Sequence, residues 1–477
     1  MVNRPAFAAL VLLLANGAAG QVLLKGSVTS RDSGQFRMLP FEVPAGTRRV
    51  DVQLTFTGRD QGTQLYLGIF DPIMYRGAGR LSFTISEYDA TPPFAPGPIV
   101  PGTWHLALGV VNVNPERTSD YTARIDFSTS DDRPTGIVLR SEPGWYKGDL
   151  HSHTGHSDGV CLSQAGKNVP CPAFKLVEAA AARHLDFLAI TDHNTAVTLN
   201  SIREMQPYFD RLLLIHGREM TTLAGHANVW GTAEFLDFRI GYRNWTIDDF
   251  LDQVHRAHAL VSINHAYWPV GPACPGCGWG WKEQTDFSRI DAIEIVNGYS
   301  EKGSWFQPPA GNGVPFWEEQ IALGHRITGV GGSDDHRAGE QLDRGSGVGN
   351  PTTVVYASQL SEPAILAGIK AGHVFVQLRG PEGPALYLSS GQAIMGDTIH
   401  PAANGAVEFQ VRAKDCTGCK AALIFDGRTV KSWTVDRNVQ SDPVSLTLGG
   451  GRHWVRATLQ DAAGSLVALT NPIYVNY

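Results

Sequence analysis

The segment "KGDLHSHTGHSDG", residues 147–159, holds three histidines and two aspartates in thirteen positions. Twelve of the sixteen histidines of the chain lie between His151 and His336, so imidazole groups are concentrated in one region. Imidazole gains and loses protons near neutral pH and binds metals, so clustered histidines favour a metal site, a proton relay or an anion site. The chemistry of this protein is therefore expected in the middle of the chain.

Further imidazole and carboxylate groups stand where apolar, strand-like runs begin or end. The runs are "FLAITDH", "LIHGRE", "HANVWG", "VSINH" and "TGVGGSDDH". In parallel α/β folds the carboxyl ends of the strands converge on one face, where active sites are built. We therefore expect the following side chains to meet: His151, His153, Asp158, His193, Glu219, His226, His265, Asp334 and His336.

The donor types of this set agree with one another. Imidazole and carboxylate bind zinc, manganese or iron, and a His-x-His pair places both rings on the same face of a strand. Six histidines, two aspartates and one glutamate exceed the need of one ion. We expect two or three divalent ions that share bridging ligands, and the lack of thiolate donors favours hydrolytic ions over structural zinc.

The elements that must position these residues alternate between strands and helices. From residue 144 to residue 380, apolar runs such as "DFLAITDH" and "ALVSINH" alternate with amphipathic stretches such as "PAFKLVEAAAARH" and "TIDDFLDQVHRAH". Repeating βα units of this size predict an α/β domain with a parallel sheet that can close into a barrel.

The flanking regions have the texture of β-sheets. Residues 21–140 contain short strands such as "RRVDVQLTF" and "TWHLALGVV" between Pro- and Gly-rich turns, which predicts a β-sandwich. The pattern "PGTWHLALGVVN" followed by "SDYTARIDF" resembles the bacterial pre-peptidase C-terminal type of accessory domain. Residues 381–477 return to alternating strands and predict a second β-sandwich.

Residues 1–20 have the pattern of a secretory signal peptide. Arg4 precedes an apolar run from Ala6 to Ala15, and small residues follow before Gln21. We expect a secreted or periplasmic protein. The six cysteines fall into three near pairs, which in an oxidising compartment predicts three local disulfides; the alternative joins the two C-x-x-C pairs into a four-cysteine zinc site. The pairs are Cys161 with Cys171, Cys274 with Cys277, and Cys416 with Cys419.

The composition limits the classes of partner. The chain has 477 residues, 43% of them hydrophobic, and a formal net charge of −7. This charge gives no general attraction to nucleic-acid phosphates, so we expect no nucleic-acid partner. No later segment reaches the ~18 apolar residues of a membrane span, so we expect no stable membrane insertion. The sequence leaves the oligomeric state open.

The motifs of the middle region resemble a known family. "GDLHSHTGHSDG", "ITDHNT", "GREMTTLAGHANVWG", "SINHA" and "GGSDDH" look, in this order, like the successive motifs of the PHP (polymerase and histidinol phosphatase) superfamily. "DAIEIVNG" and "ILAGIKAGHVFVQLRGP" resemble its exported, carbaryl-hydrolase-like branch. The resemblance covers about half of the chain and implies a distorted seven-stranded β/α (TIM-like) barrel with a metal centre that usually holds three ions.

The resemblance also implies how the ligands are divided. A first ion would be bound by His151, His153, Glu219 and Asp334. Glu219 would bridge to a second ion that is also bound by His226 and His265. A third ion would be bound by Asp158, His193 and His336. Some relatives place a histidine one position after Asp158, where this chain has Gly159, and many read NHP where this chain has Ala266.

Other residues near the motifs are candidates for catalysis, for orienting the ligands or for lining a substrate pocket. We interpret His156, Arg218 and Arg337 as candidate catalytic residues that donate a proton or bind an anion; the alternatives are a pocket wall for His156 and ion pairs for the arginines. Asp192 is expected to orient His193 or its strand. Four aromatic residues after His265 are expected to line a substrate pocket: Tyr267, Trp268, Trp279 and Trp281.

The leading hypothesis is an exported metal-dependent phosphoesterase that acts on a small phosphomonoester or phosphodiester. Paired ions about 3.5–4 Å apart can hold a bridging hydroxide at neutral pH, and this hydroxide would attack phosphorus. A second hypothesis is a carbamate or carboxylic-ester hydrolase with the same metal centre. A third is a non-catalytic surface protein whose β domains bind carbohydrate or a partner.

Overall fold

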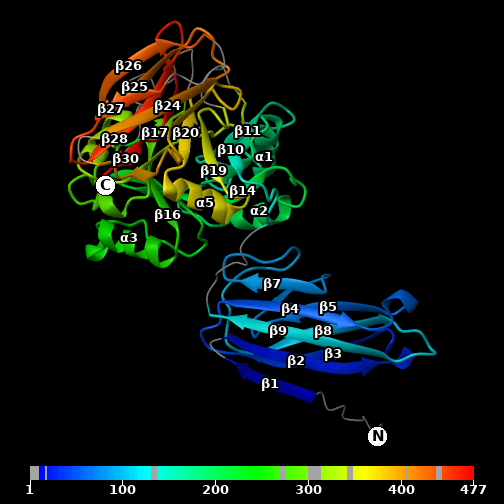
Figure 1. The fold of residues 1–477 in the computed structure, drawn as a ribbon. Coiled ribbons are helices and arrows are strands. Elements are labelled where there is room, and N and C mark those ends of the chain that lie inside the picture. Colours follow the sequence, from blue (N-terminus) through cyan, green and yellow to red (C-terminus); the bar gives the residue numbers. More distant parts are fainter. Residues whose placement is uncertain are drawn as a thin grey trace. The chain divides into compact units, whose positions relative to one another are not determined.

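The computed structural model describes residues 10–16, 19–129, 137–268, 276–298, 313–340, 347–402, 405–436 and 443–477. The chain divides into two compact units: one contains residues 1–134 and 199–204, and the other contains residues 135–198 and 205–477. Figure 1 shows the helices and strands of both units as a ribbon. The described residues include no helix that is both long and apolar enough to cross a membrane.

The first unit contains two antiparallel sheets that share one apolar core. One sheet has the order β1 (Leu10–Asn16), β2 (Ala19–Val28), β9 (Ser119–Ser128), β4 (Arg49–Phe56), β7 (Ser82–Ser86). The other has the order β3 (Gln35–Val43), β8 (Gly102–Asn112), β5 (Gln64–Phe70), β6 (Tyr75–Ala78). Buried and exposed residues alternate along β9, as expected for a strand with one face in the core. The bounds of the expected domains stay predictions.

The second unit is built on a long mixed sheet. Its first seven strands lie side by side in chain order: β10 (Gly144–Asp149), β13 (Phe187–Ile190), β14 (Leu213–Thr222), β15 (Gly225–Trp230), β16 (Leu260–Ile263), β17 (Ala292–Asn297) and β18 (Thr328–Gly332). Most of these strands are buried on both faces, which explains their nearly continuous apolar sequences.

The expected parallel pairing is found at four of the six contacts between these strands and is wrong at β15. Strand β15 pairs antiparallel with both β14 and β16, whereas β10–β13, β13–β14, β16–β17 and β17–β18 are parallel. The cause is a tight turn in "GREMTTLAGHANVWG". Thr222 pairs with Gly225 across the two-residue turn Leu223–Ala224, and Gly225 adopts φ 151°, a conformation that favours glycine.

The two ends of the seven-strand series meet at one point. Directly after β10 and β18, Ser152 and Asp335 form a parallel bridge. The His153 amide donates to the carbonyl of Asp335 at 2.9 Å, and the Asp334 amide donates to the carbonyl of His151 at 2.9 Å. Within the described residues no continuous ladder joins β18 to β10, and the seven-stranded barrel stays a prediction. The bridge brings the first and last ligand motifs together.

Five α-helices are described, and all lie between strands as the sequence predicts. They are α1 (Ala173–Ala182), α2 (Thr198–Met205), α3 (Ile247–Arg256), α4 (Val314–Ala322) and α5 (Glu362–Ala371). Short 3₁₀ turns are η1 (Ser30–Asp32), η2 (Arg59–Gln61), η3 (Tyr242–Asn244) and η4 (Phe287–Arg289). Helix α3 begins at a Thr246–Asp249 capping box and buries Phe250, Leu251 and Val254.

The C-terminal strands extend the same sheet and add a second layer. Beyond β10 the sheet continues through β19 (Thr352–Ala357), β20 (Val374–Gln377), β29 (Leu466–Thr470), β28 (His453–Gln460), β25 (Lys420–Phe425) and β26 (Arg428–Thr434), with β23 (Thr398–Ile399) and β30 (Ile473–Val475) beside it. A second sheet has the order β22 (Ala393–Ile394), β21 (Ala385–Ser390), β24 (Ala406–Lys414), β27 (Val444–Thr447). An apolar core fills the space between the two layers.

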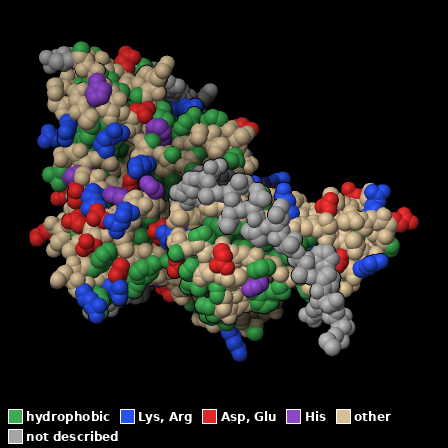
Figure 2. All heavy atoms as spheres, turned by 90° about the horizontal axis from the view of Figure 1, so that it is seen from below, with side chains coloured by type: hydrophobic (Ala, Val, Ile, Leu, Met, Phe, Trp, Pro, Cys, Tyr) green, Lys and Arg blue, Asp and Glu red, His purple; other side chains and the backbone are tan. Residues whose placement is uncertain are grey.

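Two of the three predicted disulfides are present. Cys161 is bonded to Cys171 across the hairpin β11 (Val160–Leu162) and β12 (Asn168–Pro170), and Cys416 is bonded to Cys419. The third predicted pair includes Cys274, which lies outside the described residues. On the face shown in Figure 2, acidic and basic side chains are interspersed, in keeping with the small net charge of −7.

Candidate metal centre

The nine predicted ligands come together in one cluster, and most of them stand at or just beyond the ends of strands in the series β10 and β13–β18. His151 and His153 follow β10, and His193 follows β13. The remaining ligands come from β14, β15, the ends of β16 and β18, and the loop before β11: Glu219, His226, His265, Asp334, His336 and Asp158. Their ligand atoms form three groups, and within each group these atoms lie within 4.8 Å of one another.

The first group is buried and has the spacing of a coordination shell. The Nε2 atoms of His151 and His153 lie 3.1 Å apart, and they lie 3.3 and 3.4 Å from Oε2 of Glu219. Oδ1 of Asp334 lies 3.2 Å from His151 Nε2 and 3.0 Å from His153 Nε2. Four ligands at ~2.0–2.2 Å from a tetrahedral zinc have edges of about 3.3–3.6 Å. The five distances are thus within a few tenths of an ångström of those in such a shell, and the four donors fit one ion.

Glu219 joins the first group to the second. Its Oε1 atom lies 3.2 Å from Nδ1 of His226 and 3.2 Å from Nε2 of His265, while Oε2 faces the first group. Nε2 of His226 is buried and, within the described part of the chain, lacks a hydrogen-bond partner. An unpaired buried nitrogen is costly unless something absent from the structure binds it. The donor set of the second group thus fits a metal ion.

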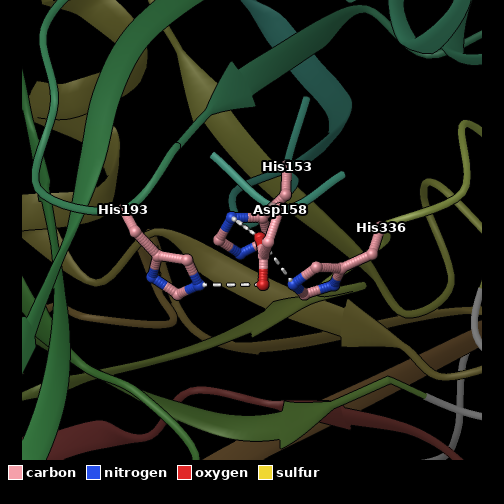
Figure 3. Close-up of side chains that lie close together, drawn as sticks. All are labelled: His153, Asp158, His193 and His336. Atoms are coloured by element: carbon pink, nitrogen blue, oxygen red, sulfur yellow. Dashed lines mark ion pairs between the residues drawn. The ribbon is translucent and has the colours of Figure 1, made fainter. Parts of the chain in front are cut away.

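The third group is the most exposed of the three, and Figure 3 shows its four side chains turned toward one another. Asp158 points between three rings: it lies 3.3 Å from Nε2 of His336, 3.6 Å from Nε2 of His193 and 3.9 Å from Nδ1 of His153. Its side chain is 56% exposed, whereas that of His153 is fully buried. The ring of His153 belongs to both the first and the third group. The family resemblance implied the first group alone.

The charges of the cluster stabilise one another without metal. Burial disfavours the charged form of His193, but the hydrogen bonds with Asp158 and Glu219 outweigh it and raise the pKa of His193 to about 10. Burial also disfavours the charged form of His336, but its interactions with Asp158 and Asp334 outweigh burial and raise the pKa of His336 to about 9. Burial lowers the pKa of His153 to about 4. Burial alone would raise the pKa of Glu219, yet the surrounding histidines hold it well below its usual range.

Two carboxylates beneath the ligands were missed in the sequence. Oε1 of Glu294 lies 3.0 Å from Nδ1 of His151, and Oε2 accepts the His265 amide at 3.1 Å. Asp149 accepts the amides of His151, Ser333 and Gly349 at 3.1, 3.0 and 2.6 Å. Both are buried. A charged residue inside an apolar strand, as in "DAIEIVNG", was the available signal for Glu294.

Asp192 holds the loop that follows His153. It is fully buried and accepts hydrogen bonds from the amide and hydroxyl of Thr154, both at 2.7 Å. It also accepts the hydroxyls of Ser157 at 2.7 Å and Thr198 at 2.6 Å. Its carboxylate therefore orients the residues on both sides of His156, whereas we expected it from the sequence to orient His193 or its strand. The ring of His193 is instead bonded to Thr221, with Nδ1 at 2.5 Å from the hydroxyl.

The three candidate catalytic residues lie in different surroundings. His156 is exposed, and its Nδ1 atom lies 3.0 Å from the Thr154 hydroxyl. Arg218 precedes Glu219 on β14, so its side chain points to the opposite face of the strand, where it donates to the carbonyl of Thr232 at 2.9 Å. This placement does not support anion binding beside the ligands. Arg337 donates to the side chain of Asn168 at 3.3 Å.

The aromatic residues after His265 divide into two kinds. The ring of Trp268 stacks on His265, with centroids 4.6 Å apart, and Tyr267 is partly exposed, so both can line a pocket. Trp279 belongs to the apolar core, and the Trp281 indole donates to the Thr222 hydroxyl at 3.0 Å. The prediction of a pocket wall is therefore wrong for Trp279, because its ring is needed for packing.

One departure from the family pattern, at Gly159, has a physical explanation. A Cβ atom on Gly159 would lie 2.7 Å from the backbone of Thr154, so no histidine fits at this position and the carboxylate of Asp158 takes its place. Asp335, next to Asp334, accepts the amides of Arg337, Gly339 and Val348 and does not join the three groups.

Comparisons with known proteins give similar solved structures but no sequence family. No protein-family model matches the chain, and no curated protein matches it. A two-domain protein from Bacteroides vulgatus, described as containing a predicted PHP-like metal-dependent phosphoesterase, matches 72% of this chain and 100% of its own, with 17% identity and a TM-score of 0.37. A protein from Bifidobacterium adolescentis, assigned as a metal-dependent phosphoesterase, matches 46% of this chain and 94% of its own, with 16% identity and a TM-score of 0.31. The first of these two descriptions names the PHP type, which the sequence motifs resemble.

Proposed function

We propose that this protein is an exported metal-dependent hydrolase of the PHP type that cleaves phosphomonoesters or phosphodiesters. One observation carries the proposal: three groups of histidine and carboxylate donors, linked through Glu219 and His153, come together in one cluster. We infer that the seven strands β10 and β13–β18 form the distorted barrel of that superfamily. Zinc, manganese and iron suit this donor set, and the number of ions is two or three.

The residues of the chain would hold the ions in the three groups described above. Divalent ions, when bound, supply Lewis acidity and an activated water for ester hydrolysis. The buried first and second groups exclude bulk water, which strengthens their electrostatic effect on a bound substrate. The third group, with Asp158 half exposed, faces solvent, so the substrate ester would enter on this side. His156 lies on the same loop and is the candidate proton donor to the leaving group.

Export is proposed on two grounds. The signal pattern covers residues 1–20, and two disulfides are present in the described residues, which is typical of oxidising compartments. Cleavage before Gln21 would remove β1 and leave β2 paired with β9 along Gln21–Val28. Mass spectrometry of the protein from the periplasm or medium would give the mature N-terminus, and an intact Met1 in exported protein would contradict this part.

The activity test uses metal-free protein that is reconstituted with zinc or manganese. We expect metal-dependent hydrolysis of p-nitrophenyl phosphate or bis-p-nitrophenyl phosphate, and loss of that activity in Glu219→Gln. The matched control is Glu382→Gln, whose side chain is 70% exposed. Assays of 1-naphthyl carbamate and acetate run beside them. Turnover of these carbonyl substrates without any phosphoester turnover would mean that the same centre hydrolyses carbamates or carboxylic esters and not phosphoesters.

A further inference from the structure

The loop that carries Asp158 is attached at two points to a disulfide-bonded hairpin. The amide of Gly155 donates to the carbonyl of Cys171 at 2.6 Å, and the amide of Cys171 donates to the carbonyl of Gly159 at 2.8 Å. Both contacts flank Asp158 in the sequence. Cys171 is in turn bonded to Cys161 at the other side of the β11–β12 hairpin.

The same hairpin also contacts a second ligand of the third group. The amide of Val160, the first residue of β11, donates to the carbonyl of His336 at 2.7 Å. Asp158 and His336 lie 3.3 Å apart, so the hairpin binds the backbone on both sides of this ligand pair. The first and second groups, by contrast, are built on strand ends within the sheet.

The fit between loop and hairpin is tight. A Cβ atom on Gly155 would lie 2.7 Å from the Cys171 nitrogen and 2.8 Å from the Pro170 carbonyl carbon, so the backbones touch directly. Both cysteines are buried, with exposures of 0% and 1%. Asp158 is exposed, so its position is set by the backbone contacts of the loop with the hairpin, together with the hydrogen bonds that Asp192 accepts from Thr154 and Ser157.

We infer that the Cys161–Cys171 disulfide is a positioning element for the third metal group. It fixes the hairpin, the hairpin fixes the Asp158 loop and the His336 backbone, and this spacing sets the affinity of the third group for its ion. This inference rests on the proposed metal centre. It makes the third ion, and not the first two, depend on a disulfide whose cysteines belong to none of the three donor groups.

The test measures zinc binding by calorimetry and by metal analysis of the full-length protein. In Cys161→Ala/Cys171→Ala we expect the zinc affinity of the third group to fall about 10–100-fold, with the first two groups unchanged. Asp158→Asn identifies the binding step that belongs to the third group. The matched control is Cys416→Ala/Cys419→Ala, which removes a disulfide from the C-terminal layer and should keep all three steps.

A second variant leaves the disulfide intact. Gly155→Ala should push the loop from Cys171 and weaken the same step, whereas Gly450→Ala, which has open space around it, should not. Equal third-group affinity in the disulfide variant and its control, or in Gly155→Ala and Gly450→Ala, overturns the inference, as does a wild type that binds only two ions. A lower melting temperature without a selective effect on one step also counts against it. If the wild type binds no zinc, the proposed metal centre itself fails.

Discussion

Glu294 and His151 form a buried pair in which Oε1 of the carboxylate lies 3.0 Å from Nδ1 of the ring. Burial disfavours the charged form of His151, but Asp334, Glu219 and Glu294 outweigh it and raise the pKa of the ring well above its usual value, so both ring nitrogens carry protons in the metal-free protein. When a metal replaces the proton on Nε2, the other proton would stay on Nδ1 beside Glu294. The contact thus fixes the orientation of the ring and the nitrogen that is available to a metal.

Glu294→Gln tests this relationship. An amide keeps the shape but loses the charge that favours the Nδ1 proton, so we expect the affinity of the first group for zinc to fall about 10–100-fold. Competition with a chelator measures the effect, with Glu382→Gln as the exposed control. An unchanged affinity would mean that the strand ends alone orient His151.

Metal binding should release protons. In the metal-free protein the pKa values of His193 and His336 are raised to about 10 and about 9, so both rings are protonated at pH 7, whereas a metal needs them neutral. We expect proton release on zinc binding at pH 7, and a rising affinity as the pH approaches 9–10. Calorimetry in buffers with different ionisation enthalpies measures the release. His193→Asn should reduce it, and heats that do not depend on the buffer would contradict the prediction.

The same shifts affect the stability of the metal-free protein. Both folded pKa values lie above the unfolded value of ~6.5, so the stabilisation from these ion pairs is complete below that pH. It is lost as the pH rises through 9–10.

His156→Ala separates catalysis from metal binding. The ring is exposed and is not part of the three donor groups, so we expect the zinc content to stay unchanged. If His156 donates a proton to the leaving group, its loss should lower kcat by about 100-fold or more. His255→Ala, on the exposed side of α3, is the control. An unchanged kcat would leave His156 as part of the pocket wall.

Asp149→Asn should destabilise the fold around the centre. The carboxylate accepts three amides, and an asparagine side chain has a single acceptor oxygen and would set its own donor against one of them. Burial raises the pKa of Asp149 to about 6, although these three amides favour the charged form. We expect a loss of about 1–3 kcal/mol in urea unfolding. The exposed Asp60→Asn is the control, and equal stability of the two variants would contradict the role.

The ligands could be predicted because each follows or opens an apolar run, and the ends of such strands converge. His151, Glu219 and Asp334 therefore come together although 183 residues separate the first from the last. The roles of Glu294 and Asp149 could not be predicted, since they depend on which backbone amides and ring atoms lie beside them in the folded sheet.

The main difference between the predicted and the observed fold comes from one local turn. The turn at Leu223–Ala224 reverses the chain, so β15 runs antiparallel in a sheet that was expected to be parallel. Cys161 and Cys171 were paired correctly from their spacing, yet the contacts of Cys171 with Gly155 and Gly159 follow only from the folded hairpin.

Anomalous X-ray diffraction from crystals grown with zinc tests the central claim most directly. We predict anomalous peaks within coordination distance of the first and second groups, with Glu219 between them, and a further peak beside Asp158, His193 and His336. Crystals of Glu219→Gln should lose the two peaks of the first and second groups, which Glu219 joins. The absence of any peak among these nine residues in zinc-loaded crystals would contradict the account.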